Sequence, residues 1–446
     1  MASSFSLTGS ICRKWFAGIA NCPIGGKLMS RSCSSAECCR YRLNSSFYRK
    51  GMSTLAKPNP SPSSSPWLML QPAFDVDASG AASRSYKFYR LADNKIVTLS
   101  TGKSSKEREI TNPLIEFRGS SHGWLALYDH SRLDVFLYNP ITGHHISLPP
   151  FGHFPDYPPT SKGLYNKVIL SCSPDEGSNC RAIMIYNNVA ALAFCCPGFS
   201  KEWTRIGDHH WFDQDSGRAV FWGYADCVYS TRHEALFCLT RLGVLESWDI
   251  RDPQSPRAVK IAEVSQEGGR LSYPRTGKKK FWLVSSRMES LVVAGEDLLV
   301  VTQYVVDSFY FDGLYVDGNA QYILAEELGL PGVTVDFDVH KYDPEDGELK
   351  YVEGSGSCLG GWALFVGLHS DAVALPAAEF PELKPNSIYF SNATEDASIE
   401  HLLTGGHDIG IFNYENKTVP PCYFPCDPKN LRKTYPAPMW YVRPKS

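Results

Sequence analysis

The segment Gly119–Pro150 constrains the fold more than any other part of this chain. It contains three short apolar runs, Gly123–Asp129, Val135–Tyr138 and Ile146–Leu148, which are separated by turn-forming pairs such as Asn139-Pro140. Short apolar runs that are bounded by such pairs are typical of antiparallel strands joined by tight turns. The segment therefore predicts most of one four-stranded antiparallel unit.

Similar units follow along the chain after Trp67. We find no convincing helix there, and groups of four short strands recur at a period of roughly fifty to sixty residues, which is typical of propeller blades. Gly123-Trp124 precedes the run LALY, and Gly361-Trp362 precedes ALFV, so the two pairs look like one position in two blades. The repeat predicts a ring of blades.

The fold class that we predict is all-β, a single β-propeller of six or seven four-stranded blades that begins near Trp67 and runs to the C-terminus. Either Trp67–Leu70 or Tyr86–Leu99 is expected to close the ring, because closure from both ends removes exposed sheet edges. Two packed β-sandwiches are the alternative fold.

The N-terminal segment differs from the rest in charge. Residues 1–57 contain one acidic residue, Glu37, while Leu7, Ile11, Trp15 and Ile19 recur every four residues, as on one face of a helix. The segment has nine basic side chains: Arg13, Lys14, Lys27, Arg31, Arg40, Arg42, Arg49, Lys50 and Lys57. A disordered, amphipathic leader that is rich in Arg and Ser and poor in acids is typical of organellar transit peptides.

We therefore predict a transit peptide over residues 1–50, a Pro/Ser-rich linker over 51–66 and the propeller over 67–446. The mitochondrion is the expected destination, with the plastid as the alternative and cleavage expected between Arg40 and Lys57. If the leader is not functional, the protein stays in the cytosol or nucleus.

The body of the chain is acidic and has no membrane span. Beyond residue 57 there remain 35 Lys and Arg against 46 Asp and Glu, and an acidic surface repels nucleic-acid phosphates. No apolar run reaches the roughly 18 residues that a spanning helix needs. The fourteen Cys include no C-x-x-C pair, so we expect buried free thiols. Nucleic-acid binding and membrane insertion are not expected.

The motifs that could carry chemistry favour structural interpretations. Gly119–Gly123 matches G-x-S-x-G, but a strand follows it where a nucleophile elbow needs a helix, so we expect Ser121 to cap a turn. Asp336, Asp338 and His340 alternate with apolar residues and could bind a metal or transfer protons, but a strand with one wet face is the simpler interpretation. We expect no catalytic residues, no metal and no cofactor.

Three blocks of sequence resemble a known family. They are GSSHGWLALYD with FLYNPITGHHISLPP, then Phe337–Gly367 with its continuation to Asn392, and Asp408–Asn413 with the tail PAPMWYVRP. Together they resemble the plant family catalogued as domain of unknown function 295, the KIB-type β-propeller. Gly361 follows Gly360 where that family more often has an acidic residue. Residues 1–66 lack the leucine run of an F-box, so the chain is similar to an organellar branch without one. The resemblance implies a propeller of unassigned role.

We expect a non-enzymatic module that binds a protein partner through surface loops. The loops 151–163 and 211–217 carry aromatic residues that are unusual for idle turns: Phe154, Tyr157, Trp211 and Phe212. Exposed aromatics anchor interfaces, although these rings could instead fold back onto the propeller. Two alternatives remain, namely an enzyme with its site in the propeller channel and an F-box-type substrate adaptor that has lost its F-box.

Overall fold

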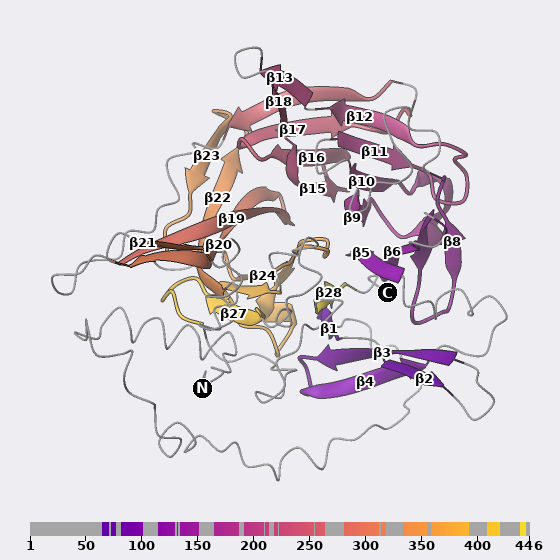
Figure 1. Cartoon of the computed structure of the whole chain (residues 1–446), viewed down its shortest axis with the longest axis horizontal. Coiled ribbons are helices and arrows are strands. Elements are labelled where there is room, and N and C mark those ends of the chain that lie inside the picture. Colours follow the sequence, from indigo (N-terminus) through magenta and orange to yellow (C-terminus); the bar gives the residue numbers. More distant parts are fainter. Residues whose placement is uncertain are drawn as a thin grey trace, which may run out of the picture.

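Six antiparallel or mixed sheets of four or five strands stand in a ring in the computed structural model (Figure 1). The structure describes residues between 65 and 442, and its longest gaps are 101–114, 151–164, 264–280, 318–332, 392–407 and 420–437. Residues 1–64, and with them the leader and most of the linker, lie outside the described part. The chain is therefore an all-β propeller with six blades.

Each of the first three blades is a meander whose strands follow one another from the centre outward. Blade 1 comprises β5 (Ile115–Ser121), β6 (Trp124–Asp129), β7 (Asp134–Tyr138) and β8 (His145–Ser147). Blade 2 comprises β9 (Tyr165–Leu170), β10 (Ala182–Tyr186), β11 (Ala191–Cys195) and β12 (Thr204–Asp208). Blade 3 comprises β15 (Tyr224–Ser230), β16 (Ala235–Thr240), β17 (Val244–Asp249) and β18 (Arg257–Glu263).

The remaining blades depart from the simple meander. Blade 4 comprises β19 (Phe281–Ala294), β20 (Asp297–Phe311), β22 (Val333–Asp343) and β23 (Glu348–Tyr351). Blade 5 runs in the spatial order β25 (Val373–Pro376), β24 (Trp362–Val366), β26 (Ser387–Phe390) and β27 (Gly410–Asn413). Its chain turns inward after β24, so β24 and β26 pair in parallel.

Blade 6 is built from both ends of the chain. Its strands are β28 (Met439–Tyr441), β1 (Trp67–Met69), β2 (Ala73–Val76), β3 (Ala82–Arg90) and β4 (Lys95–Ser100). β28 pairs with β1, while β1 and β2 pair with successive parts of β3. The N-terminal strand therefore closes the ring, as predicted, and the C-terminal strand supplies the innermost position.

One strand of each blade lies nearest the centre. In blades 1 to 4 it is the first along the chain, in blade 5 it is β25, and in blade 6 it is β28. The inner strands β28, β5, β9, β15, β19 and β25 neighbour one another around the ring. Strands this close leave little room for side chains. A Cβ on Gly119 of β5 would lie 2.0 Å from the carbonyl oxygen of Val168 on β9, so only glycine fits there.

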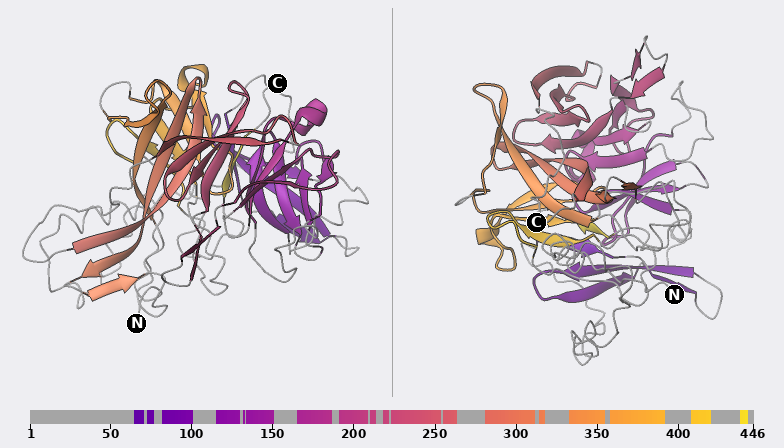
Figure 2. Two further views of the ribbon diagram at one scale, coloured as in Figure 1. Left: turned by 90° about the horizontal axis from the view of Figure 1, so that it is seen from above. Right: turned by 60° about the vertical axis from the view of Figure 1, so that its left-hand side comes forward.

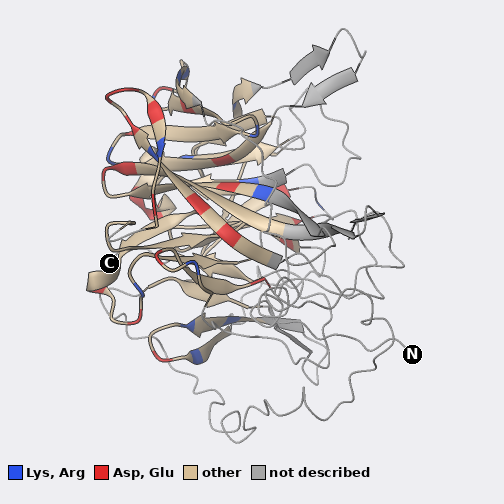
Figure 3. Ribbon diagram, turned by 90° about the vertical axis from the view of Figure 1, so that its left-hand side faces the viewer, with Lys and Arg blue, Asp and Glu red and all other residues tan. Residues whose placement is uncertain are grey.

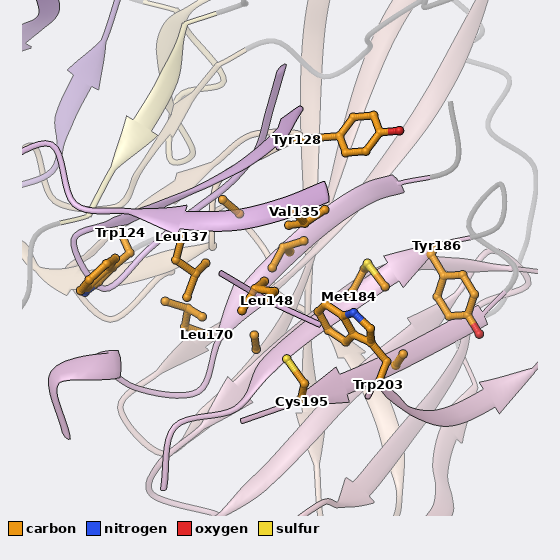
Figure 4. Close-up of a cluster of buried hydrophobic side chains, with 14 of the residues drawn as sticks. Trp124, Tyr128, Val135, Leu137, Leu148, Leu170, Met184, Tyr186, Cys195 and Trp203 are labelled. Atoms are coloured by element: carbon orange, nitrogen blue, oxygen red, sulfur yellow. The ribbon is translucent and has the colours of Figure 1, made fainter. Parts of the chain in front are cut away.

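Six clusters of buried hydrophobic side chains fill the spaces between neighbouring blades, one at each interface. Between blades 1 and 2, Trp124 and Leu137 face Leu170 and Met184 (Figure 4). In the same cluster the indole nitrogen of Trp203 donates to the Pro149 carbonyl at 2.7 Å. The core of the protein is thus divided among the interfaces between blades, and no blade has a core of its own.

The terminal strands also contribute side chains to the clusters on both sides of their blade, because side chains alternate between the two faces of a strand. Trp67 and Met69 of β1 pack against blade 1, whereas Leu68 packs against blade 5. On β28, Tyr441 faces blade 1 and Trp440 faces blade 5. Two three-residue strands therefore complete two of the six interfaces.

Two antiparallel extensions leave the ring. The hairpin β13 (His210–Asp213) and β14 (Arg218–Phe221) lies between blades 2 and 3 and pairs with neither. The outer parts of β19 and β20 continue past blade 4, where β21 (Leu314–Asp317) joins them. Both extensions project from the same face of the ring (Figure 2).

The three apolar runs predicted within Gly119–Pro150 correspond to β6, β7 and β8. Tyr86–Leu99, one of the two segments expected to close the ring, forms most of β3 and β4 in blade 6. Before Trp124, Gly119–Ser121 belong to β5 and only His122 and Gly123 form a turn. The Ser121 hydroxyl does not cap that turn; it bonds to Asp371 and to the amide of Leu170. The alternative of two packed sandwiches does not describe this ring.

We predict that Trp440→Ala destabilises the whole propeller. Trp440 is fully buried, and its ring packs edge-on against that of Phe365, with the ring centroids 5.1 Å apart. Removing a buried Trp side chain costs about 3–5 kcal/mol. Urea denaturation should show this loss in one cooperative transition, while the control Phe199→Ala, at a side chain that is 63% exposed, should change stability by less than about 0.5 kcal/mol. Equal effects of the two substitutions would contradict a closed ring.

Candidate functional site

The motif GSSHG comprises the end of β5 and the tight turn that leads from β5 into β6. Ser121 pairs with Trp124, which leaves His122 and Gly123 as the two turn residues, with φ of 49° and 82°. Two residues with positive φ form the turn type that best matches the twist of a β-hairpin. The amide of Gly123 donates to the Val442 carbonyl at 2.6 Å, so the turn also holds the C-terminal strand.

The second Gly-Trp pair has the same geometry. Gly360 and Gly361 have φ of 60° and 79°, and the amide of Trp362 donates to the Leu359 carbonyl at 3.0 Å. β24, like β6, is the second strand of its blade counted from the centre. The two pairs therefore start the second strand of a blade in the same way, but they are not fully equivalent: Trp124 packs between blades 1 and 2, whereas Trp362 packs between blades 4 and 5, against the preceding blade. Glycine at position 361 suits its positive φ better than the acidic residue that the family more often has.

Ser121 connects three segments through its hydroxyl group. The hydroxyl donates to Asp371 Oδ2 at 2.8 Å and accepts from the amide of Leu170 on β9 at 3.2 Å. Ser121 and Asp371 are both buried. A side chain at the end of β5 thereby joins blades 1 and 2 to the loop that leads into β25 of blade 5.

A buried ion pair makes a second connection. Lys167 of β9 donates from Nζ to Asp226 Oδ1 of β15 at 2.7 Å. The same carboxylate accepts from the amide of Cys227 at 2.8 Å and, through Oδ2, from the amide of Leu291 on β19 at 2.9 Å. The pair therefore joins the inner strands of blades 2, 3 and 4.

The segment His369–Asp371 completes the arrangement. The amide of Ser120 donates to the His369 carbonyl at 2.9 Å, and the amide of Asp371 donates to the Ser120 carbonyl at 2.9 Å. Ser370 Oγ accepts from the amide of Trp440 at 3.0 Å. This segment of blade 5 thus bonds to blades 1 and 6. We call Ser121, Lys167, Asp226, Ser370 and Asp371 the inner polar cluster.

Burial dominates the electrostatics of the inner polar cluster. It raises the pKa of Asp371, although the nearby charges of His122 and Lys167 and the Ser121 hydroxyl oppose the shift. Burial alone would lower the pKa of Lys167, but the charge and hydrogen bond of Asp226 outweigh it, so this pKa is raised. One oxygen of Asp371, Oδ1, is buried without a hydrogen-bond partner.

This arrangement suits adhesion between blades better than catalysis. Ser121 and Asp371 are both buried, whereas a nucleophilic serine and its base must be accessible to a substrate. Lys167 and Asp226 are occupied by each other and by backbone amides. Within the described ranges, no group of three or more His, Cys, Asp or Glu is placed to hold a metal ion.

Asp336, Asp338 and His340 lie on one partly exposed face of β22, and the apolar residues on either side of Asp338 are fully buried. The simpler interpretation of a strand with one wet face is confirmed. Tyr304 donates to Asp338 Oδ2 at 2.8 Å, and Lys417 Nζ lies 3.5 Å from Asp336 Oδ1. Burial raises the pKa of Asp336 against the charge of Lys417 and lowers that of His340.

The four aromatic residues proposed for partner binding are only partly described. Phe154 and Tyr157 lie outside the described residues. Trp211 and Phe212 lie on β13 of the projecting hairpin, opposite Val220 and Ala219, and not in a loop. The sequence missed the inner polar cluster because its members are far apart; Ser121 and Asp371 are 250 positions apart.

We predict that Lys167→Met destabilises the protein by about 3–5 kcal/mol, because it leaves Asp226 buried without its counter-ion. The double variant Lys167→Met with Asp226→Leu should lose less than the sum of the two single losses, because both charges are then removed. A double-mutant cycle measured by urea denaturation tests this. Additive losses would show that the two side chains do not interact.

We also predict a change in the pH dependence of stability for Asp371→Asn. Because the folded-state pKa of Asp371 is raised, its carboxyl group loses its proton more readily in the unfolded chain. Its contribution to stability therefore falls as the pH rises from the unfolded pKa, about 3.9, through the folded pKa.

The variant lacks this fall, so its stability relative to the natural protein should be higher at pH 7 than at pH 3.5. Chemical denaturation at both pH values measures the difference. A relative stability that is the same at both values would contradict the shift.

A chain from the crystal structure of a nidogen/laminin complex is 9% identical, with 64% of this chain and 91% of that chain covered at a TM-score of 0.23. A protein of unknown function from Bacteroides thetaiotaomicron is 11% identical, with 61% and 70% covered at a TM-score of 0.25. At such TM-scores neither likeness carries an argument. No curated protein matches the chain.

The family comparison is informative because it covers most of the ring. The model of the KIB1-4 beta-propeller matches residues 85–413, a range that begins in β3 and ends at the last residue of β27. The motifs GSSHGW and GGW, whose turns precede β6 and β24, both fall inside it. The chain belongs to the KIB1-4 β-propeller family.

Proposed function

We propose that this propeller is a non-enzymatic module that binds a protein partner through the face from which the two β-extensions project. The observation that carries the proposal is the hairpin β13–β14, which belongs to no blade. An isolated two-stranded hairpin is at best marginally stable in water. A hairpin that pairs with no blade and is only marginally stable alone gains stability when a partner packs against it.

The composition of the extensions supports the same face. β13 has the sequence HWFD, the outer part of β19 begins FWLV, and β20 ends SFYF next to LYVD of β21. Aromatic residues are enriched in protein interfaces because they bury a large area at a low entropy cost. The aromatic residues that we expected in a partner-binding loop, Trp211 and Phe212, belong to this face.

The charge distribution favours a protein partner over a nucleic acid. Acidic and basic positions are interspersed on the side of the ring that Figure 3 shows. Binding to a phosphate backbone depends on clustered Lys and Arg, whereas the chain after residue 57 carries more Asp and Glu than Lys and Arg. In the part of the chain that the structure describes, no helix is both long and apolar enough to cross a membrane.

The chemistry of the inner polar cluster favours this proposal over an enzyme. An active site needs polar groups that are available to a substrate. Both carboxylate oxygens of Asp226 accept hydrogen bonds, and Ser121 both donates and accepts. These groups hold blades together.

Partner binding is tested with the double variant Trp211→Ala and Phe212→Ala. We expect the variant to remain folded, with an unchanged thermal midpoint, and to lose at least tenfold in affinity for partners co-purified with the natural protein, about 1.4 kcal/mol or more. Phe199→Ala is the matched control, because its ring is 63% exposed but lies on blade 2 between β11 and β12. A variant that keeps its partners, or loses them only because it unfolds, contradicts the proposal.

We also propose that the module acts in mitochondria, as a member of an organellar branch of the family, with the plastid as the alternative. The support is the acid-poor leader in front of an acidic body. Residues 1–60 fused to a fluorescent protein should direct it to mitochondria, and the variant with Arg13, Lys14 and Lys27 changed to Glu should not. Diffuse fluorescence from the unmodified fusion would refute this part of the proposal.

A further inference from the structure

Two free cysteines flank the short connection between β9 and β10. Cys172 lies two residues after the end of β9 and is half-buried, while Cys180 lies two residues before β10 and is fully buried. Between them the chain forms the 3₁₀ segment η5 (Pro174–Asn179), which begins with a capping box formed by Ser173 and Glu176. The connection is therefore an ordered turn that fixes the positions of both cysteines.

The pairing of the two strands places the cysteines opposite each other. Leu170 pairs with Ala182, and the amide of Ser171 donates to the Arg181 carbonyl at 2.9 Å. The next opposed pair is Cys172 and Cys180. The amide of Arg181 donates to Ser171 Oγ at 2.8 Å and so makes no second backbone bond. The two cysteines follow directly on the last bonds between these segments, on opposite sides of the connection, as a disulfide between neighbouring segments requires.

The thiol of Cys180 also lies against Cys172. Cys180 Sγ donates to the Cys172 carbonyl at 3.2 Å, and Ser171 Oγ donates to Cys172 Sγ at 3.8 Å. The hydrogen bond between the two thiols lowers the pKa of Cys172, whereas that contact and burial raise the pKa of Cys180. Cys172 is thus the nucleophile of the pair, and Cys180 holds its proton.

We propose that Cys172 and Cys180 form a redox-active dithiol that a hydroperoxide converts into an intramolecular disulfide. The Cys172 thiolate attacks the terminal peroxide oxygen, the O–O bond breaks, and Cys172 becomes a sulfenic acid while the peroxide leaves as an alcohol or water. Cys180 then attacks the sulfenic sulfur, forms the S–S bond and releases water. Two thiols and one hydroperoxide thereby yield one disulfide, one water and one reduced peroxide.

The surroundings of four other described cysteines disfavour this chemistry. Burial raises the pKa of Cys195, Cys227 and Cys238, so they persist as protonated thiols. Cys358 is half-buried like Cys172, but burial raises its pKa as well. A thiol reacts through its thiolate, and Cys358 is therefore a matched comparison for Cys172.

The experiment uses the full-length protein with hydrogen peroxide as the probe. In the reduced protein at pH 7, iodoacetamide should alkylate Cys172 about tenfold faster than Cys358, as followed by peptide mass spectrometry. After brief peroxide treatment, Cys172 and Cys180 should become resistant to alkylation together. Their peptides should appear linked, and dithiothreitol should release them.

The variant Cys180→Ser separates the two steps. It should stop at the sulfenic acid of Cys172, which a cyclic 1,3-dione captures, whereas Cys172→Ser should form neither product and Cys358→Ser should behave like the natural protein. If Cys172 reacts no faster than Cys358, or if peroxide yields no linkage between positions 172 and 180, the proposal is overturned. Unchanged circular dichroism of each variant shows that the result does not come from unfolding.

Discussion

The pairing of β1 with β28 is the constraint on which the rest of this structure depends. A propeller blade buries its faces only against its neighbours, and all six hydrophobic clusters lie between blades. An open ring would expose two of those faces and one row of unpaired backbone groups. Two strands of three residues each prevent this, because their alternating side chains serve blades 1 and 5 at the same time.

The inner polar cluster also joins neighbouring blades, through hydrogen bonds near the centre of the ring. Backbone groups converge there and side chains have little space, as the contact between Gly119 and the Val168 carbonyl illustrates. Short polar side chains such as Ser121 reach the backbone of the next blade, and Asp226 spans two interfaces through its two oxygens. Burying charges is costly unless each is paired and hydrogen-bonded. The network meets this requirement except at Asp371 Oδ1.

Local structure could be predicted from the sequence because its signals are local. Apolar runs and turn-forming pairs indicated the strands β6, β7 and β8 of blade 1. The two Gly-Trp pairs indicated the start of a second strand in blades 1 and 5, but not that their Trp side chains face opposite neighbours. The inward turn of blade 5 was missed, because its parallel pairing joins segments that local pattern cannot relate. β28 was interpreted as part of a tail, since three residues are too few to show a period.

The candidate site was harder to predict for the same physical reason. Hydrogen bonds between blades join residues that are distant in sequence, such as Lys167 with Asp226 and Ser121 with Asp371. G-x-S-x-G marked the right place but suggested a nucleophile or a cap. Gly119 leaves room for the Val168 carbonyl and Gly123 adopts a positive φ. Ser121 forms hydrogen bonds to neighbouring blades. The hairpin that carries Trp211 and Phe212 was expected as a loop, because its strands are short and belong to no blade.

Native-state hydrogen exchange of the terminal strands tests the central claim most directly. The claim is that β1 and β28 lock the ring, so that no blade interface can open alone. The amide of Trp440, which donates to Ser370 Oγ, should then exchange only through global unfolding, with the same free energy as the amides of β7 in blade 1. Exchange of the β28 amides at a free energy several kcal/mol lower would contradict the account, because the ring would then open at this seam while the other blades remain folded.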